Sequence, residues 1–261
     1  MTKGIVTPAY IPLRRDPSHS SEMISQLLFG ETFDIIDPNP VSWIRVRNHY
    51  DNYEGWIFKD PSCLLTEKSA DILEKCKPLV LNRRFATLTM LSSDKELIVS
   101  AGSILYLDPD DASRVYAGHW YGLDRPVEAL SGDISASLQT LAGQFLNSPY
   151  IWGGKSAFGT DCSGLVQTLF RILGIMIKRD SSEQHKKGKT VNMPVESVPG
   201  DLVFFDNEDG EIVHTGVLLD QGHVLHASGR VRIDPIDHQG IYDESTGTYS
   251  HKLRLTKRII E

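Results

Sequence analysis

The chain has 261 residues, 40% of them hydrophobic, which is enough apolar material for two or three separate cores. Its formal net charge is −7 at pH 7, with 27 Lys and Arg against 34 Asp and Glu. An acidic chain without clustered cations lacks the surface that nucleic acid or an anionic membrane requires, so both are excluded as partners.

The cysteines and the N-terminal segment bear on the compartment. Cys63, Cys76 and Cys162 are an odd number at spacings that suit neither a disulfide framework nor a zinc site, so reduced thiols are expected. The first residues pass directly into mixed polar sequence around Pro12, without an apolar stretch long enough for export or membrane spanning. We therefore predict a cytoplasmic protein, and we expect a monomer.

Residues 1–66 contain short β-rich runs separated by turn formers. Apolar and polar residues alternate from Trp43 to Arg47, and a turn-forming segment at 48–52 leads into a second run at 53–58. This pattern predicts a hairpin within a small all-β barrel.

A polar segment with helical character at 67–77 ends at Pro78 and is typical of a linker. Short strand patterns then return over residues 78–125. They predict a second small barrel, although no exact repeat relates it to the first. The strand candidates in this second barrel are residues 84–90, 96–100, 103–107 and 114–116.

Residues 126–261 carry helical as well as strand patterns, which predicts a mixed α+β domain. A second helix is expected from Asp161 or Cys162 to Leu173, with Gly174 as its stop. A first helix is indicated by a single apolar stripe at helical spacing, made of Ile134, Leu138, Leu141, Ala142, Phe145 and Leu146. Strands are expected at 201–205, 212–219, 223–227 and 252–260.

Cys162 is the candidate nucleophile. It follows a glycine-containing loop and precedes Ser163 and Gly164 at the predicted start of the second helix. Free N–H groups and the positive end of the helix dipole favour a thiolate at such a position. Asp161 is expected to cap the helix. The alternative is that Cys162 is a small buried hydrophobe, the role that we assign to Cys63 and Cys76.

His214 and His226 are the candidate base and its orienting partner. They lie on two predicted strands joined by residues 220–222, which resemble a three-residue hairpin loop with its glycine in the left-handed conformation. If the strands pair through Leu219 and His223, Gly216 lies opposite His226, and the two histidines share one face as diagonal neighbours. His223 falls on the other face. A thiol nucleophile needs such an oriented base.

Two other interpretations of these three side chains stay open. Each histidine could be a satisfied polar group at a sheet edge. Cys162, His214 and His226 could also supply three ligands of a catalytic zinc site. We predict neither a metal nor any other cofactor.

The motifs of the last 130 residues resemble the NlpC-type, papain-like cysteine peptidases, which hydrolyse bacterial cell-wall peptides. Five segments occur in the order and spacing of that family: Tyr150–Gly154, Thr160–Leu165, Arg179–Gln184, Pro199–Phe205 and the segment from His214 to His226. The resemblance implies an α+β fold, with a papain-like domain after two small all-β SH3-like barrels. The expected boundaries are 1–66, a linker at 67–77, 78–125 and 126–261.

This three-part arrangement is similar to the γ-D-glutamyl-L-diamino-acid endopeptidases, including enzymes of murein-peptide recycling. The resemblance implies cleavage of L-Ala-γ-D-Glu-(diamino acid) peptides after D-Glu, with a free N-terminal L-Ala required. It implies that Tyr150 helps to stabilise the oxyanion. Asp161 and Ser163 would line the substrate cleft, and Trp152 and Ser181 would contact the D-Glu region.

In the same family the first barrel holds the amino group of the peptide. Glu31 is the candidate for that charge contact, with Tyr53 or Trp56 packing nearby, whereas an ordinary surface glutamate is the alternative. Two other functions use the same scaffold: a catalytically inactive module that only binds wall peptides, and an acyltransferase that passes the acyl group to an amine or lipid.

Overall fold

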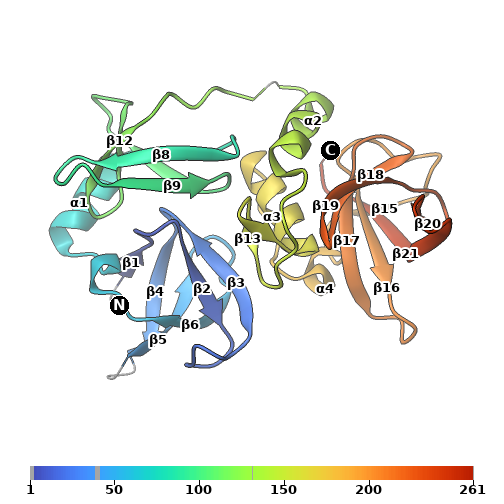
Figure 1. The fold of residues 1–261 in the computed structure, drawn as a ribbon, viewed down its shortest axis with the longest axis horizontal. Helices are drawn as coiled ribbons and strands as arrows, with labels where there is room; N and C mark the ends of the chain where they lie inside the picture. The colour runs from blue at the N-terminus through green and yellow to red at the C-terminus, as the bar shows by residue number, and fades with distance from the viewer. Residues whose placement is uncertain (1–2, 39–41, 131, 261) are drawn as a thin grey trace. The chain divides into compact units, whose positions relative to one another are not determined.

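The computed structural model describes residues 3–38, 42–130 and 132–260. The chain forms two compact units. The first contains Met1–Ala129 together with Trp152–Ala157, and the second contains Leu130–Ile151 and Phe158–Glu261. Figure 1 colours the chain from blue at the N-terminus to red at the C-terminus, so the first unit is mainly blue to green and the second mainly yellow to red.

The first unit begins with a six-stranded antiparallel sheet in the order β1-β4-β5-β6-β2-β3. The expected hairpin is present, since Trp43 pairs with Phe58 and Val46 with Gly55. Alternate residues point into a core that includes Leu13, Phe33 and Val46. The strands are β1 (Lys3–Ile5), β2 (Tyr10–Arg14), β3 (Met23–Leu28), β4 (Thr32–Asp37), β5 (Trp43–Asn48) and β6 (Glu54–Phe58).

A short 3-10 helix, η1 (Pro61–Cys63), and helix α1 (Glu67–Lys75) lead to a second six-stranded sheet. Thr66 caps α1 by accepting a hydrogen bond from the Ser69 N–H. The sheet order is β7-β10-β11-β12-β8-β9. As in the first sheet, strands that are distant in sequence lie side by side. Its strands are β7 (Lys77–Val80), β8 (Phe85–Met90), β9 (Glu96–Ser100), β10 (Ile104–Leu107), β11 (Arg114–Tyr116) and β12 (Trp120–Leu123). The short strand β13 (Lys155–Ser156) also belongs to this unit.

The second unit combines helices with an antiparallel sheet in the order β15-β21-β16-β17-β18-β19, and β20 pairs with β21. Helix α3 packs against β17 and β18 of this sheet (Figure 1). The elements are α2 (Ile134–Phe145), β14 (Gly159–Thr160), α3 (Cys162–Ile172), α4 (Ser181–Gln184), β15 (Lys189–Val191), β16 (Leu202–Asp206), β17 (Ile212–Leu218), β18 (His223–Ser228), β19 (Arg230–Pro235), β20 (Gly240–Asp243) and β21 (Thr248–Arg258).

Helix α3 begins and ends where the sequence predicts. The Asp161 carboxylate accepts a hydrogen bond from the Gly164 N–H at 2.7 Å, which satisfies one of the free donors of the first turn. Gly174, just past the end, has φ +78°, a conformation that glycine adopts without strain. The helix is buried along almost its whole length, so Cys162 sits on a rigid element.

These observations confirm an α+β chain in which two all-β sheets precede a mixed unit. One segment differs from expectation, because Trp152–Ala157 belongs to the first unit and not to the mixed one. Its backbone accounts for this: the Lys155 N–H donates to Gln26 Oε1 at 3.0 Å, and the Ala157 N–H donates to Ser100 Oγ at 2.7 Å. The predicted boundaries at 66, 77 and 125 stay predictions.

Across the described ranges, every helix is too short or too polar to cross a membrane.

Candidate active site

The two candidate histidines lie on the hairpin of β17 and β18. Gly216 pairs with His226 and Val217 with Leu225, which is the register expected from the sequence. A Cβ atom on Gly216 would lie 3.1 Å from the Cβ of His226, so glycine leaves room for the imidazole. His223 is exposed and contacts Asp220 at the turn, away from the other two rings.

The loop of this hairpin differs in one detail. Gly222 does not have a positive φ, so the expected left-handed glycine is wrong. Instead, the Asp220 carboxylate accepts a hydrogen bond from the Gly222 N–H at 2.7 Å. A side-chain acceptor of this kind closes the turn without a left-handed residue.

His214 and His226 form a direct hydrogen bond, with 2.9 Å between Nε2 of His214 and Nδ1 of His226. Both side chains are buried. Burial, followed by the neighbouring rings of His251 and His226, holds the pKa of His214 well below its usual value. The imidazole of His214 is therefore neutral near pH 7, as a general base must be before it takes a proton.

Two further side chains beside this pair were not anticipated from the sequence. The carboxylate of Asp234 on β19 lies 2.8 Å from Nε2 of His226, and its other oxygen accepts a hydrogen bond from Arg232 at 2.8 Å. The ring of His251 on β21 stacks on His214, with 4.2 Å between ring centroids. Alternating apolar and polar residues at 230–235 are a strand signal that could have located Asp234.

Cys162 is nearly buried, with 6% of its surface exposed, and its sulfur faces strand β17. Burial and the Asp161 carboxylate raise the pKa of the thiol to about 11, against the opposing effects of the Thr215 and Ser163 backbone N–H groups and of Arg179. The expectation that this position favours a thiolate is therefore wrong, since burial outweighs the two backbone N–H groups and Arg179. Cys162 needs a base, and Thr215, whose N–H contacts the sulfur, directly follows His214.

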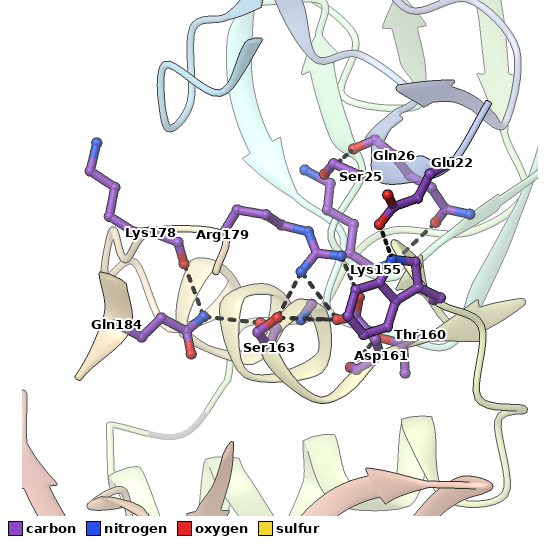
Figure 2. A network of polar contacts seen from close by, with 12 residues as sticks. Glu22, Ser25, Gln26, Lys155, Thr160, Asp161, Ser163, Lys178, Arg179 and Gln184 are labelled. Atoms are coloured by element: carbon purple, nitrogen blue, oxygen red, sulfur yellow. Dashed lines mark hydrogen bonds and ion pairs between the residues drawn. The ribbon is translucent and has the colours of Figure 1, made fainter. Parts of the chain in front are cut away.

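Arg179 is a buried cation beside Cys162, and the sequence indicated only that it belongs to a family motif. Its guanidinium donates to Asp161 Oδ2 at 2.7 Å and to the Ser163 hydroxyl at 2.8 Å. Figure 2 shows this guanidinium between the two side chains, with Gln184 donating to the Ser163 and Lys178 carbonyls beside them. The network fixes the residues on either side of Cys162.

Asp161 and Ser163 are thus engaged in the frame of helix α3, and their contact with substrate stays a prediction. Tyr150, the candidate oxyanion donor, is half-buried, and its backbone N–H bonds to the Gly229 carbonyl at 3.1 Å. Burial, then the charges of Cys162 and Asp161, raise the pKa of the Tyr150 phenol to about 12. The phenol keeps its proton at neutral pH and can donate a hydrogen bond. Ser181 is the first residue of α4.

The remaining predicted residues lie in the first unit. The Trp152 side chain is 61% exposed, and its indole N–H donates to Glu22 at 2.6 Å. Tyr53 and Trp56 are half-buried in the first sheet. The Trp152 side chain is therefore largely accessible, whereas Tyr53 packs against the barrel core.

Glu31 is almost fully buried and already paired. One carboxylate oxygen lies 2.8 Å from the Lys155 ammonium, and the other accepts a hydrogen bond from the Asn48 amide at 2.9 Å. Glu31 also borders a cavity of about 160 Å³ whose other lining residues are Thr32, Asn48, His49, Tyr50 and Ile104. The pairing with Lys155 does not favour binding of the peptide amine by Glu31, so this role stays a prediction.

The structure gives no cluster of three or more His, Cys, Asp and Glu side chains arranged to hold a metal among residues 3–38, 42–130 and 132–260. Both ring nitrogens of His226 are in hydrogen-bond contact, one with His214 and the other with Asp234.

Comparison with known families matches two parts of the chain. Residues 147–250 match the NlpC/P60 family, and residues 13–60 match the bacterial dipeptidyl-peptidase SH3 domain. The matches fall on the mixed unit and on the first sheet, which confirms the SH3-like character of the N-terminal part.

Characterised relatives align with most of the chain. A Bacillus subtilis protein named gamma-D-glutamyl-L-lysine dipeptidyl-peptidase is 31% identical over 78% of this chain and 71% of its own length. A Bacillus cereus protein of the same name is 27% identical over 88% of this chain and 75% of its own length. Dipeptidyl-peptidase 6 of Lysinibacillus sphaericus is 25% identical over 90% of this chain and 92% of its own.

A crystal structure of an NlpC/P60 family protein from Bacillus cereus has the same fold, with a TM-score of 0.81 at 23% identity over 99% of this chain and 100% of that one. An NlpC/P60 endopeptidase from Photobacterium damselae has a TM-score of 0.73 over 98% of this chain and 73% of its own, at 17% identity. With a cysteine at the start of a buried helix, a buried pair of hydrogen-bonded histidines and relatives along most of its length, this chain belongs to the NlpC/P60 family of cysteine peptidases.

Proposed function

We propose that this peptidase hydrolyses the bond between the γ-carboxyl of D-Glu and a diamino acid in murein peptides that begin with a free L-Ala. The names of the Bacillus relatives support the γ-D-glutamyl bond and a dipeptidyl product. The observation that carries the proposal is the 2.9 Å hydrogen bond between His214 and His226. His214 directly precedes Thr215, whose N–H contacts the Cys162 sulfur.

Catalysis begins with a neutral thiol and a neutral imidazole, because burial disfavours both charged forms. Nε2 of His214 is occupied by His226, so Nδ1 is the nitrogen that takes the Cys162 proton. The sulfur then attacks the γ-glutamyl carbonyl. Tyr150 and the Cys162 backbone N–H donate to the oxyanion, the amine of the diamino acid leaves with a proton from His214, and water hydrolyses the thioester.

The compartment and the assembly are further parts of the proposal. We place the enzyme in the cytoplasm as a monomer, where it would process released murein peptides during cell-wall recycling. Trp152, with its largely accessible side chain, and Ser181 are proposed to contact the D-Glu region.

A panel of synthetic peptides tests this function. L-Ala-γ-D-Glu-diaminopimelate and its lysine counterpart are incubated with the enzyme, each with a free or an acetylated L-Ala, and the products are identified by mass spectrometry. Release of the dipeptide L-Ala-γ-D-Glu from the free peptides alone supports the proposal. Equal cleavage of the acetylated peptides refutes the requirement for a free amino terminus, and transfer of the acyl group to an added amine in preference to water indicates an acyltransferase.

The two histidines should differ in the same assay. Replacing His214 by Ala removes the base, whereas replacing His226 by Ala removes only the group that orients it. In enzymes with an oriented base, the orienting residue contributes less to kcat than the base. We therefore expect His214→Ala to lose more activity than His226→Ala, and the reverse order would exchange their roles.

A further inference from the structure

The side chain of Asp234 contacts His226 on the side away from His214. His214, His226 and Asp234 come from three neighbouring strands, β17, β18 and β19. His226 pairs with Arg232 across β18 and β19, so Asp234, two residues further on, shares the face of His226 and lies diagonal to it. The three side chains therefore form a continuous row of hydrogen bonds, with heavy-atom distances of 2.9 Å and 2.8 Å.

The chemistry of these groups decides where each proton resides. A carboxylate accepts hydrogen bonds and cannot donate them, so the His226 nitrogen facing Asp234, Nε2, must carry hydrogen. In neutral His226 the other nitrogen, Nδ1, is then an acceptor. Because Nδ1 of His226 faces Nε2 of His214, the hydrogen between the rings belongs to His214. Nδ1 of His214 is left with a lone pair.

We propose that Asp234 is a positioning residue for the peptidase reaction, which acts through His226 to hold His214 in the one tautomer that can accept the Cys162 proton. The inference rests on the proposed roles of Cys162, His214 and His226. Asp234 touches neither the sulfur nor the base, and its effect is exerted through two consecutive imidazole rings.

Arg232 contacts both oxygens of this carboxylate. Its Nη2 donates to Oδ1 of Asp234 at 2.8 Å, and its Nε lies 2.6 Å from Oδ2, the oxygen that also faces His226. The guanidinium therefore does not decide which way an amide at position 234 would turn, and removal of the carboxylate is the direct change. In Asp234→Ala nothing accepts from Nε2 of His226, so the hydrogen of that ring can move to Nδ1 and be donated to Nε2 of His214. His214 then carries its own hydrogen on Nδ1, and the base is blocked.

Arg232→Met is the variant that separates positioning from anchoring. It removes the partner of the carboxylate but leaves Oδ2 of Asp234 to accept from His226, so the active tautomer is kept. A carboxylate that only anchors strand β19 through its ion pair would behave differently, because loss of either partner would then cost about the same.

The kinetic experiment compares wild type, Asp234→Ala and Arg232→Met on L-Ala-γ-D-Glu-diaminopimelate. A carboxylate-to-amide change behind a histidine base costs about 10⁴ in kcat in serine proteases. Here, where Asp234 acts through two rings, we expect Asp234→Ala to lose about 10-fold to 10³-fold in kcat with little change in KM, and Arg232→Met to stay within about 5-fold of wild type.

Asp220→Asn is the matched control. Asp220 contacts the ring of His223 at 3.0 Å on the same hairpin, and both side chains are exposed. This variant should keep the kcat of wild type. Cys162→Ala and His214→Ala are measured alongside. If they remain active, the proposed function fails. If they are inactive but Asp234→Ala is within about 3-fold of wild type, or Arg232→Met loses as much activity as Asp234→Ala, only the role of Asp234 is overturned.

A second measurement needs no variant of Asp234 to fold. Long-range ¹H–¹⁵N spectra of the wild-type enzyme with ¹⁵N-labelled histidine report the tautomer of each ring, and His214→Gln and His226→Gln provide the assignments. We expect hydrogen on Nε2 of both His226 and His214 near pH 8. Hydrogen on Nδ1 of either ring would overturn the proposal.

Discussion

At the scale of single residues, the chemistry depends on which groups are charged before substrate arrives. Cys162 lies between an anion, Asp161, and a cation, Arg179, that act on its thiol in opposite directions. Asp161 is needed as the cap of α3, so the buried guanidinium compensates a charge that the helix start requires. Arg179 therefore lowers the pKa of the Cys162 thiol through its charge, without a hydrogen bond to the sulfur being required.

Replacement of Arg179 by Met should make Cys162 less reactive. The Asp161 carboxylate would lose its buried partner, and the uncompensated charge would raise the pKa of the thiol further. It would also cost about 3–5 kcal/mol of stability. We expect slower alkylation by iodoacetamide at every pH between 7 and 9, whereas Arg179→Lys, which keeps the charge but not the two parallel hydrogen bonds, should lie between Met and wild type. Unchanged alkylation in the folded Met variant contradicts this role.

The expected pH profile follows from the proposed role of His214 as a base, which requires its neutral form. Burial together with His251 and His226 lowers the pKa of His214 well below 6.5. The catalytically competent neutral form is therefore retained as the pH falls through 6.5, and activity declines only at lower pH. We expect the acidic limb of kcat/KM, which reports the free enzyme, to lie below 6.5. An acidic limb above pH 6.5 would contradict this expectation, because it would mean that a nearby negative charge, and not burial, determines the pKa of His214.

At the scale of elements, the hairpin of β17 and β18 sets the distance between the two imidazoles. Gly216→Ala would place a Cβ 2.6 Å from a methyl group of Val224 and 3.1 Å from the Cβ of His226. Both are buried and cannot easily move, so the strands must separate. We expect about 1–3 kcal/mol of destabilisation from this overpacking and a lower kcat.

Gly222→Ala is the control in the same hairpin, because the nearest atom to its Cβ would be Asp220 Oδ1 at 3.7 Å. That variant should keep both activity and stability in steady-state assays and urea unfolding. Equal kcat values for the two variants would contradict the idea that close approach at Gly216 sets the geometry.

The same hairpin shows which parts of the site could be predicted from the sequence. Periodicity and the spacing of Leu219 and His223 were enough to predict the pairing of Gly216 with His226, because side chains alternate strictly along a strand. Asp234 and His251 were not predicted. The alternation at 230–235 indicates a strand, but no short loop of known length fixes the register of that strand or of β21 against the histidines. The high pKa of Cys162 could not be foreseen either, because desolvation depends on packing that no local motif encodes.

At the scale of the whole molecule, the chain passes between the two units more than once. Trp152–Ala157 belongs to the first unit although Cys162, only a few residues later, belongs to the second. The buried pair of Lys155 and Glu31 ties this segment to the first sheet at 2.8 Å. Glu31 was predicted from the sequence to contact substrate. Its burial and its ion pair with Lys155 could not be predicted, because an ion pair between distant segments leaves no local sequence pattern.

Lys155→Met should therefore destabilise the first unit. It leaves the Glu31 carboxylate buried without its cation, and loss of one partner of such a pair costs about 3–5 kcal/mol. The double variant with Glu31→Gln removes both charges and should recover most of the loss. Calorimetric unfolding of the single and double variants checks this expectation, and a single variant as stable as wild type would contradict it.

The account as a whole rests on Cys162 as the nucleophile. The direct measurement is mass spectrometry of the enzyme quenched with acid during turnover of L-Ala-γ-D-Glu-diaminopimelate, followed by peptide mapping. The account predicts an L-Ala-γ-D-Glu acyl group on the peptide that contains Cys162, none on Cys63 or Cys76, and neither acylation nor product in Cys162→Ala. Release of diaminopimelate by the Cys162→Ala variant, or an acyl group on any other residue, would contradict it.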